Sequence, residues 1–321
     1  MSSLPPSDDA TMTSEARQNG GAKRRTDANG TSQRIGVVGD VHTQWDDEDT
    51  RLLDAQGYDL VLITGDLGGY RARGAEEVAR RMAHLRTPAI AIAGNHDAVH
   101  AAQLISEALP QARPLRSLLG VGQEARVNQL AQALGPIALG GYSLHPAGAD
   151  LCVVVARPHS MGGPELAFAN ALRQRYGVRS LSDSAERLCA CVDDAPPGAR
   201  LIFLAHNACS GHGAGRADIA GRDFHRDEGD WGDPDLRAAV DHARSRGREV
   251  VAVVSGHMHL SLRGGGRRTD HVMEHGTLHL NAAEVPRHRR AERGGPVTER
   301  HHVRLEVGPS SGQVRFDHVW L

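Results

Sequence analysis

The hydrophobic residues of this chain form short, unbroken runs separated by longer polar stretches. Five runs are rich in valine, isoleucine, leucine and alanine: residues 34–38, 60–64, 89–93, 201–205 and 250–254. A strand with one face in water alternates hydrophobic and polar residues, and these runs do not alternate. They therefore predict strands that are buried on both faces, as in a largely parallel sheet covered by helices.

Segments with helical spacing lie between the runs. Residues 74–85 repeat their hydrophobic positions every three or four residues. Residues 233–247 do the same, begin with an Asp-Pro capping signal and end at a glycine. Two further helices are expected near 165–176 and 182–192. Because strands and helices alternate along the chain, the predicted fold class is α/β.

Other segments are less regular. Residues 137–146 and 151–160 predict a hairpin or further strands, and the sequences TLHLNAA, HHVRLEV and QVRFDHVW predict strands near the C-terminus. GGGRRT, at 264–269, is typical of a turn. Residues 209–232 show no periodicity. A loop of this length inside a compact domain is usually functional or disordered.

Composition divides the chain into two parts. Residues 1–33 hold almost no aliphatic side chains and predict a disordered tail, whereas 34–321 can fill the core of one catalytic domain. The formal net charge of -2 argues against general nucleic-acid or membrane affinity. No apolar run is long enough to span a bilayer, and the N-terminus has no secretory signal pattern, so a cytoplasmic location is expected. The oligomeric state stays open.

Each of the five hydrophobic runs is followed by Asp, Asn or His. The segments that follow are GDVH (39–42), GD (65–66), GNHD (94–97), HN (206–207) and SGHMH (255–259). Ligands bind at the carboxyl ends of strands in open α/β sheets. An ordinary turn explains one such ending but not five. Clustered carboxylates and imidazoles are costly to bury without cations between them, so these segments predict a metal site.

The residue types indicate which metals and how many. Oxygen and nitrogen ligands without thiolates suit Mn, Fe or Zn better than Ca or Mg. Three carboxylate or amide ligands and four histidines are more than one tetrahedral ion needs, so two divalent ions are predicted. Paired ions roughly 3.5–4 Å apart clamp the attacking and leaving oxygens of a phosphoryl transfer.

The ordered series GDVH, GD, GNHD, a lone histidine and GHMH resembles the signature of calcineurin-like metallophosphoesterases. The resemblance runs from Arg34 to about His259 and implies a four-layer αββα sandwich with a dimetal site at its strand ends. It also implies a ligand set for each ion: Asp40, His42 and His259 for the first, and Asn95, His206 and His257 for the second. Asp66 would bridge the two ions.

The same resemblance implies two catalytic residues and one exclusion. His96 would stabilise the transition state or protonate the leaving oxygen, and Asp97 would orient His96. The segments ARPHSMGG (156–163), HNACSG (206–211) and GDWGDPDL (229–236) resemble an uncharacterised branch of the superfamily. Gly69 stands where Ser/Thr protein phosphatases carry a further Asp, which argues against protein phosphatase activity.

The functional hypothesis is a dimetal-dependent phosphoesterase that acts on a phosphomonoester or phosphodiester of a small molecule or nucleotide. In-line attack by a hydroxide bridging the two metals is the expected mechanism. An aromatic content of 3% and the absence of a basic stripe argue against DNA or RNA as substrate. Two alternatives stay open: a nucleic-acid phosphodiesterase, and a non-catalytic metal-binding scaffold of the same fold.

The long loop at 209–232 begins close to His206 and has two interpretations. As a lid over the substrate, it would bind phosphate through Arg216 and Arg222, with His212 beside them. As a solvated surface insertion, it would have no part in the reaction.

Overall fold

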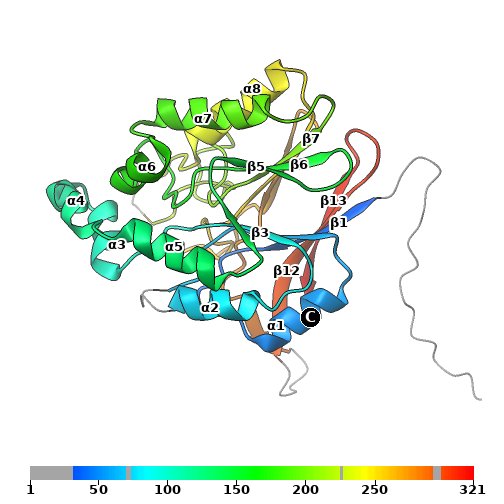
Figure 1. Ribbon diagram of the computed structural model, residues 1–321, viewed down its shortest axis with the longest axis horizontal. Coiled ribbons are helices and arrows are strands. Elements are labelled where there is room, and N and C mark those ends of the chain that lie inside the picture. Colours follow the sequence, from blue (N-terminus) through cyan, green and yellow to red (C-terminus); the bar gives the residue numbers. More distant parts are fainter. Residues whose placement is uncertain (1–31, 70–73, 225–226, 292–297) are drawn as a thin grey trace, which may run out of the picture.

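The computed structural model describes residues 32–69, 74–224, 227–291 and 298–321. The predicted N-terminal tail lies outside the described residues except for its last two, and Gln33 already belongs to the first strand. Two mixed β-sheets pack face to face, and helices cover their outer faces (Figure 1). This is the four-layer α/β sandwich implied by the sequence motifs.

The first sheet is seven-stranded, in the order β11-β12-β1-β2-β3-β4, with β13 also paired to β12. Strands β1 to β4 are parallel to one another, and β12 runs antiparallel to β1. The bounds are β1 Gln33–Val38, β2 Leu60–Ile63, β3 Ala89–Ile92, β4 Ala138–Gly140, β11 His288–Arg290, β12 Thr298–Val307 and β13 Val314–Trp320.

The second sheet is six-stranded, in the order β5-β6-β7-β8-β10-β9. Strands β6, β7, β8 and β10 are parallel, whereas β5 and β9 pair antiparallel at the two edges. The bounds are β5 Ser143–Pro146, β6 Leu151–Val155, β7 Arg200–Leu204, β8 Val250–Ser255, β9 His271–Glu274 and β10 Thr277–Asn281.

The helices lie mainly on two opposite sides of the molecule. In Figure 1, α7 and α8 run along one side and α1 and α2 along the other. No helix among the described residues is both long and apolar enough to cross a membrane. The bounds are α1 Asp47–Ala55, α2 Gly74–Met82, α3 Ala101–Ala108, α4 Arg116–Leu119, α5 Gln123–Ala133, α6 Ala169–Tyr176, α7 Leu181–Asp193 and α8 Pro234–Ser245, with a 3₁₀ helix η1 at Pro110–Leu115.

Successive residues of the central strands face two different hydrophobic cores. Leu62 belongs to the core that includes Phe203 of the second sheet. Its neighbour Val61 belongs to the core that includes Leu53 of α1 and Met82 of α2. Both faces of β2 are therefore buried, which explains why its sequence is hydrophobic without alternation.

The strands predicted from the hydrophobic runs do not all lie in the same sheet. The five hydrophobic runs divide between two sheets, with β1, β2 and β3 in the first and β7 and β8 in the second. A strand face covered by another sheet needs the same apolar residues as a face covered by a helix, so the pattern cannot distinguish the two. For the same reason, the run at 137–146 gave no sign that β4 and β5 belong to different sheets.

Candidate metal centre

The predicted ligands come together at one edge of the sandwich. The carboxyl ends of β1, β2 and β3 meet those of β7 and β8 there, and the loops that follow β1, β2, β7 and β8 form two groups of metal-binding side chains. In each group, one donor atom from each residue lies within 4.8 Å of the others. The groups are Asp40, His42 and His259, and Asp66, His206 and His257.

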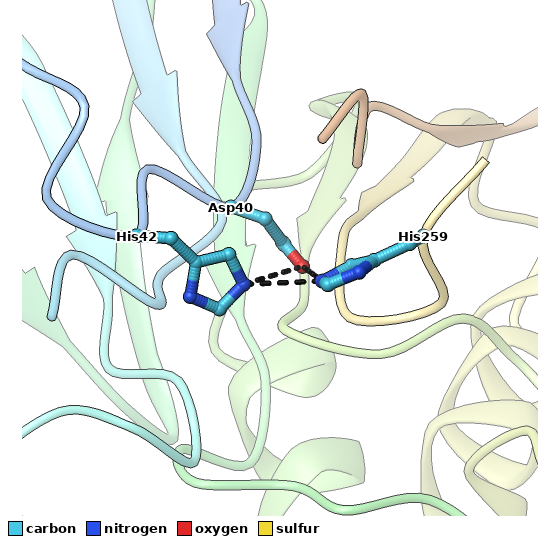
Figure 2. Close-up of side chains that lie close together, drawn as sticks. All are labelled: Asp40, His42 and His259. Carbon is cyan, nitrogen blue, oxygen red and sulfur yellow. Dashed lines mark hydrogen bonds and ion pairs between the residues drawn. The ribbon is translucent and has the colours of Figure 1, made fainter. Parts of the chain in front are cut away.

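The first group shows three donors pointing toward one another (Figure 2). Nε2 of His259 lies 3.3 Å from Oδ2 of Asp40 and 3.1 Å from Nε2 of His42. Nδ1 of His42 lies 3.2 Å from the carbonyl oxygen of Gly68, which can only accept a hydrogen bond. In the neutral imidazole the proton is therefore on Nδ1, and Nε2 keeps the lone pair that a metal ion needs.

The second group is built around His206. Its Nε2 lies 2.9 Å from Oδ1 of Asn95 and 3.5 Å from Oδ1 of Asp66. Its Nδ1 donates to the carbonyl oxygen of Thr64 at 2.7 Å, so in the neutral imidazole Nε2 keeps the lone pair that a metal ion needs. The ring of His257 meets the ring of His206 edge-on, with centroids 5.0 Å apart. Asn95 thus lies beside the second group, and its role as a metal ligand stays a prediction.

One carboxylate faces both groups. Oδ1 of Asp66 lies 3.5 Å from Nε2 of His206, and Oδ2 lies 3.8 Å from Nε2 of His42. The backbone N–H of His96 donates to Oδ1 at 2.9 Å and orients the carboxylate. The position of Asp66 supports its interpretation as a bridging ligand.

The backbone of the ligand loops is strained. Asp40, Asp66 and His257 have φ values of 28°, 50° and 65°. Such conformations cost about 1–3 kcal/mol each for residues other than glycine and are concentrated at functional sites. The neighbouring glycines leave no room for a side chain: a Cβ on Gly94 would lie 2.2 Å from Oδ1 of Asp66, and one on Gly256 would lie 2.2 Å from Oδ1 of Asp40.

The electrostatics of the centre favour bound cations. Burial acts to raise the pKa of Asp40, but the hydrogen bond and charge of His259 outweigh burial and hold this pKa below its ordinary value. Burial also acts to raise the pKa of Asp66, but the charges of His206, His96 and His42 together outweigh burial and hold this pKa below its ordinary value. Two buried carboxylates thus stay ionised and need positive charge beside them, which divalent ions would provide. The donor set fits two such ions.

His96 and Asp97 take different positions at the centre. The ring of His96 is partly exposed and meets the ring of His42 edge-on, with centroids 5.2 Å apart. Asp97 is fully buried, and its carboxylate accepts the backbone N–H groups of Gly68 at 3.0 Å and Gly94 at 2.9 Å. Burial, with the charge of Asp66, raises the pKa of Asp97 to about 7. Asp97 therefore holds two ligand loops together through their backbones, and the idea that it orients His96 stays a prediction.

The three residues predicted to bind substrate have protein partners of their own. Arg222 donates to the carbonyl oxygen of Asp227 at 2.9 Å and lies over the ring of Trp231, 4.9 Å from its centroid. Arg216 donates to the carbonyl oxygen of Arg263. The ring of His212 packs at a tilt against the ring of His279 of β10, with ring centroids 4.1 Å apart. The structure does not bring these side chains into the two ligand groups, and their contact with substrate stays a prediction.

Arg268 is a candidate functional residue that the sequence did not reveal. It is 2% exposed, and its guanidinium joins the loop at 209–232 to His259, a predicted metal ligand. Nε donates to the carbonyl oxygen of His259 at 3.0 Å, and Nη1 donates to the carbonyl oxygens of Arg216, Asp218 and Gly221. Within GGGRRT nothing distinguished Arg268 from Arg267, because only the tertiary structure brings these carbonyl groups together.

A buried ionic network connects the three segments that resemble an uncharacterised branch. Arg157, from the segment at 156–163, lies 2.8 Å from Oδ1 of Asp233 and 2.8 Å from Oδ2 of Asp235, which both belong to the segment at 229–236. Asn207 donates to Asp233 at 3.3 Å. Because Asn207 directly follows His206, this network anchors the loop after β7 that carries His206. The three sequence segments that resemble the uncharacterised branch contain the residues of this network.

The fold and these two ligand groups define a class of metal-binding α/β sandwich. The calcineurin-like phosphoesterase model matches residues 33–261, and the chain belongs to this family, which uses a dimetal centre. The chain is similar to the solved structure of TT1561 from Thermus thermophilus, with 11% identity, a TM-score of 0.51 and coverage of 89% of this chain and 99% of that chain. A dimetal phosphatase from Danio rerio has 11% identity, a TM-score of 0.47 and coverage of 88% and 98%. No curated protein sequence matches.

Proposed function

We propose that the chain is a dimetal-dependent phosphoesterase that hydrolyses a phosphomonoester or phosphodiester of a small molecule or nucleotide. One observation carries the proposal: donors from four strand ends form two groups, each within 4.8 Å, and Asp66 faces both groups. Asn95, after a fifth strand, lies 2.9 Å from Nε2 of His206. A carboxylate shared between two ions is what an in-line phosphoryl transfer between paired metals requires.

The residues divide into two binding sets. Asp40, His42 and His259 would hold one ion, and Asn95, His206 and His257 would hold the other, with Asp66 shared. Mn, Fe or Zn suits these mixed oxygen and nitrogen donors. When bound, the ions would activate water and neutralise charge on the phosphoryl oxygens. The carbonyl oxygens of Thr64 and Gly68 fix the tautomers of His206 and His42, so both rings offer Nε2.

The protein's own contribution to the reaction lies with His96. Its backbone orients Asp66, and its partly exposed ring stands beside His42. In this position the imidazole would donate a hydrogen bond to a phosphoryl oxygen in the transition state, or a proton to the leaving oxygen. Asp97 accepts the backbone N–H groups of Gly68 and Gly94 and would thereby hold the loop that carries His96 in position.

Two observations bear on the alternatives. All seven proposed ligands and His96 are present, and the ligands face one another, which favours an enzyme over a non-catalytic scaffold. Arg216 and Arg222 donate to backbone carbonyl groups, so neither side chain is free to bind a nucleic-acid backbone. A small phosphorylated molecule or a nucleotide is the proposed substrate class.

The test is a reconstitution assay. Metal-stripped protein is reloaded separately with Mn²⁺, Fe²⁺ or Zn²⁺ and assayed on p-nitrophenyl phosphate, bis-p-nitrophenyl phosphate and a panel of phosphometabolites and nucleotides. We expect at least one metal to raise turnover by more than about 10²-fold over the stripped protein, because water activation and charge neutralisation depend on the ions. Bound metal at full stoichiometry without turnover on any compound would establish the scaffold instead.

A further inference from the structure

A third group of metal-binding side chains lies outside the dimetal centre. His212 from the loop at 209–232, Glu274 from β9 and His279 from β10 each place one donor atom within 4.8 Å of the others. His279 pairs with Val253 in the middle of β8, before the loop that carries His257 and His259. Its neighbours Leu278 and Leu280 belong to the main hydrophobic core, so His279 faces the other side of the sheet.

His279 has an unusual environment for a polar side chain. It is 1% exposed, and neither of its ring nitrogens has a hydrogen-bond partner among the described residues. Its Nε2 lies 3.7 Å from Oε2 of Glu274, and the ring of His212 lies against it. A buried polar atom without a partner is destabilising, because it loses its hydrogen bond to water and gains none within the protein. Neither ring nitrogen of His279 regains the interaction with water that it lost on folding, and a bound metal ion would supply one to one of them.

The charges around the group are balanced. Oε2 of Glu274 accepts from Arg237 at 2.6 Å and from Arg244 at 3.0 Å. Asp241 lies 3.7 Å from Arg237 and 3.3 Å from Arg244. Two carboxylates thus offset two guanidinium groups, so a cation at this place would not meet a net positive charge.

We propose that His212, Glu274 and His279 bind a third divalent transition-metal ion, of which Zn²⁺ is the best-suited example. Two imidazoles and one carboxylate, with water as a fourth ligand, are a common Zn²⁺ set. Tetrahedral ligands at 2.0–2.1 Å stand roughly 3.3 Å apart, so the 3.7 Å between His279 and Glu274 needs only a small contraction. His212 also lies 3.1 Å from Nη2 of Arg237, a contact that the ion would replace.

The ion would fix the start of the loop at 209–232 to the hairpin of β9 and β10. His212 is the loop's contribution, and Glu274 and His279 are the hairpin's. Arg268 holds the middle of the same loop to His259. The third ion would thus stabilise the structure of the loop and take no part in the proposed hydrolysis.

The experiment compares Zn²⁺ content across variants of the full chain. Protein saturated with Zn²⁺ and dialysed is measured for bound metal by mass spectrometry, together with its melting temperature. We expect His279→Gln and His212→Ala each to bind about one Zn²⁺ fewer per chain than the wild type. The matched control is His275→Asn, an exposed neighbour in a left-handed turn that Asn tolerates, which keeps the full content. Zn²⁺ should raise the melting temperature of the control more than that of the two variants.

Two comparisons make the result decisive. His212 is only partly buried, so His212→Ala reports on binding even if the buried His279→Gln variant folds poorly. Asp66→Asn, which disturbs the dimetal centre, should still lose a further Zn²⁺ when combined with His212→Ala, whatever the protein hydrolyses. Equal Zn²⁺ content in His212→Ala and His275→Asn would overturn the third site and leave the proposed function untouched.

Discussion

The two sheets supply different chemistry to the same centre. The loops after β1, β2 and β3 of the first sheet carry all the oxygen donors, Asp40, Asp66 and Asn95, and one nitrogen donor, His42. The loops after β7 and β8 of the second sheet carry nitrogen donors: His206, His257 and His259. Each ligand group combines residues of both sheets, so bound ions would join the sheets at this edge.

The two kinds of donor are also held in different ways. The carboxylates accept backbone N–H groups: Asp40 accepts that of His257 at 2.9 Å, and Asp66 accepts that of His96 at 2.9 Å. The imidazole of His206, from the second sheet, is instead oriented through its side chain, by the contact of Nδ1 with the carbonyl oxygen of Thr64. A carboxylate therefore supports both loop structure and charge, whereas an imidazole supplies mainly one coordination bond. Replacing a carboxylate ligand should therefore lower turnover more than replacing a histidine ligand.

The largest effect is expected for Asp66→Asn. The amide removes the negative charge that faces both ligand groups, so both ions should bind more weakly and turnover should fall by at least about 10³-fold, as much as losing a strong transition-state donor. Metal content and kcat are measured under saturating metal. Asp47→Asn, an exposed carboxylate in the first turn of α1, is the control. Wild-type turnover with both ions retained would show that Asp66 does not bridge.

An intermediate effect is expected for His257→Ala and His259→Ala. Each ring faces a different ligand group, so each substitution should remove one ion preferentially and lower turnover by about 10²-fold, the upper part of the range for weakening one ligand's support. Metal titration of the two variants side by side gives the stoichiometry. If both variants lose the two ions in equal proportion, the histidines share one site.

The smallest effect is expected for Arg268→Lys. Lysine keeps the charge but cannot span the carbonyl oxygens of His259, Asp218 and Gly221, so the backbone of His259 should be less well positioned. We expect kcat to fall by about tenfold, with a smaller change in KM and weaker binding of the first ion. Arg267→Lys, an exposed neighbour, is the control. If only the melting temperature changes, with kcat and metal affinity as in the wild type, Arg268 stabilises the fold and does not position His259 for the reaction.

The predicted strands and the ligand series required only local information. Buried strands need unbroken apolar residues, and the motifs after β1, β2, β3, β7 and β8 stand directly in the sequence. The segment at 101–133 gave no comparable signal, and the structure forms α3, η1, α4 and α5 there. The helix α5 exposes much of its surface and begins after Gly122 without a side-chain cap, so the usual marks of a helix start are missing.

The sequence by itself determined which residues follow each buried strand, and hence the ligand types, the family resemblance and the number of ions to expect. Only the tertiary structure decided which sheet each strand joined, how Asp66 came to face both groups, and where His212, His279 and Arg268 lie. The physical reason is the range of the interactions. Hydrophobic periodicity and turn chemistry act over a few residues, whereas contacts such as that between Asp40 and His257 join positions 217 residues apart.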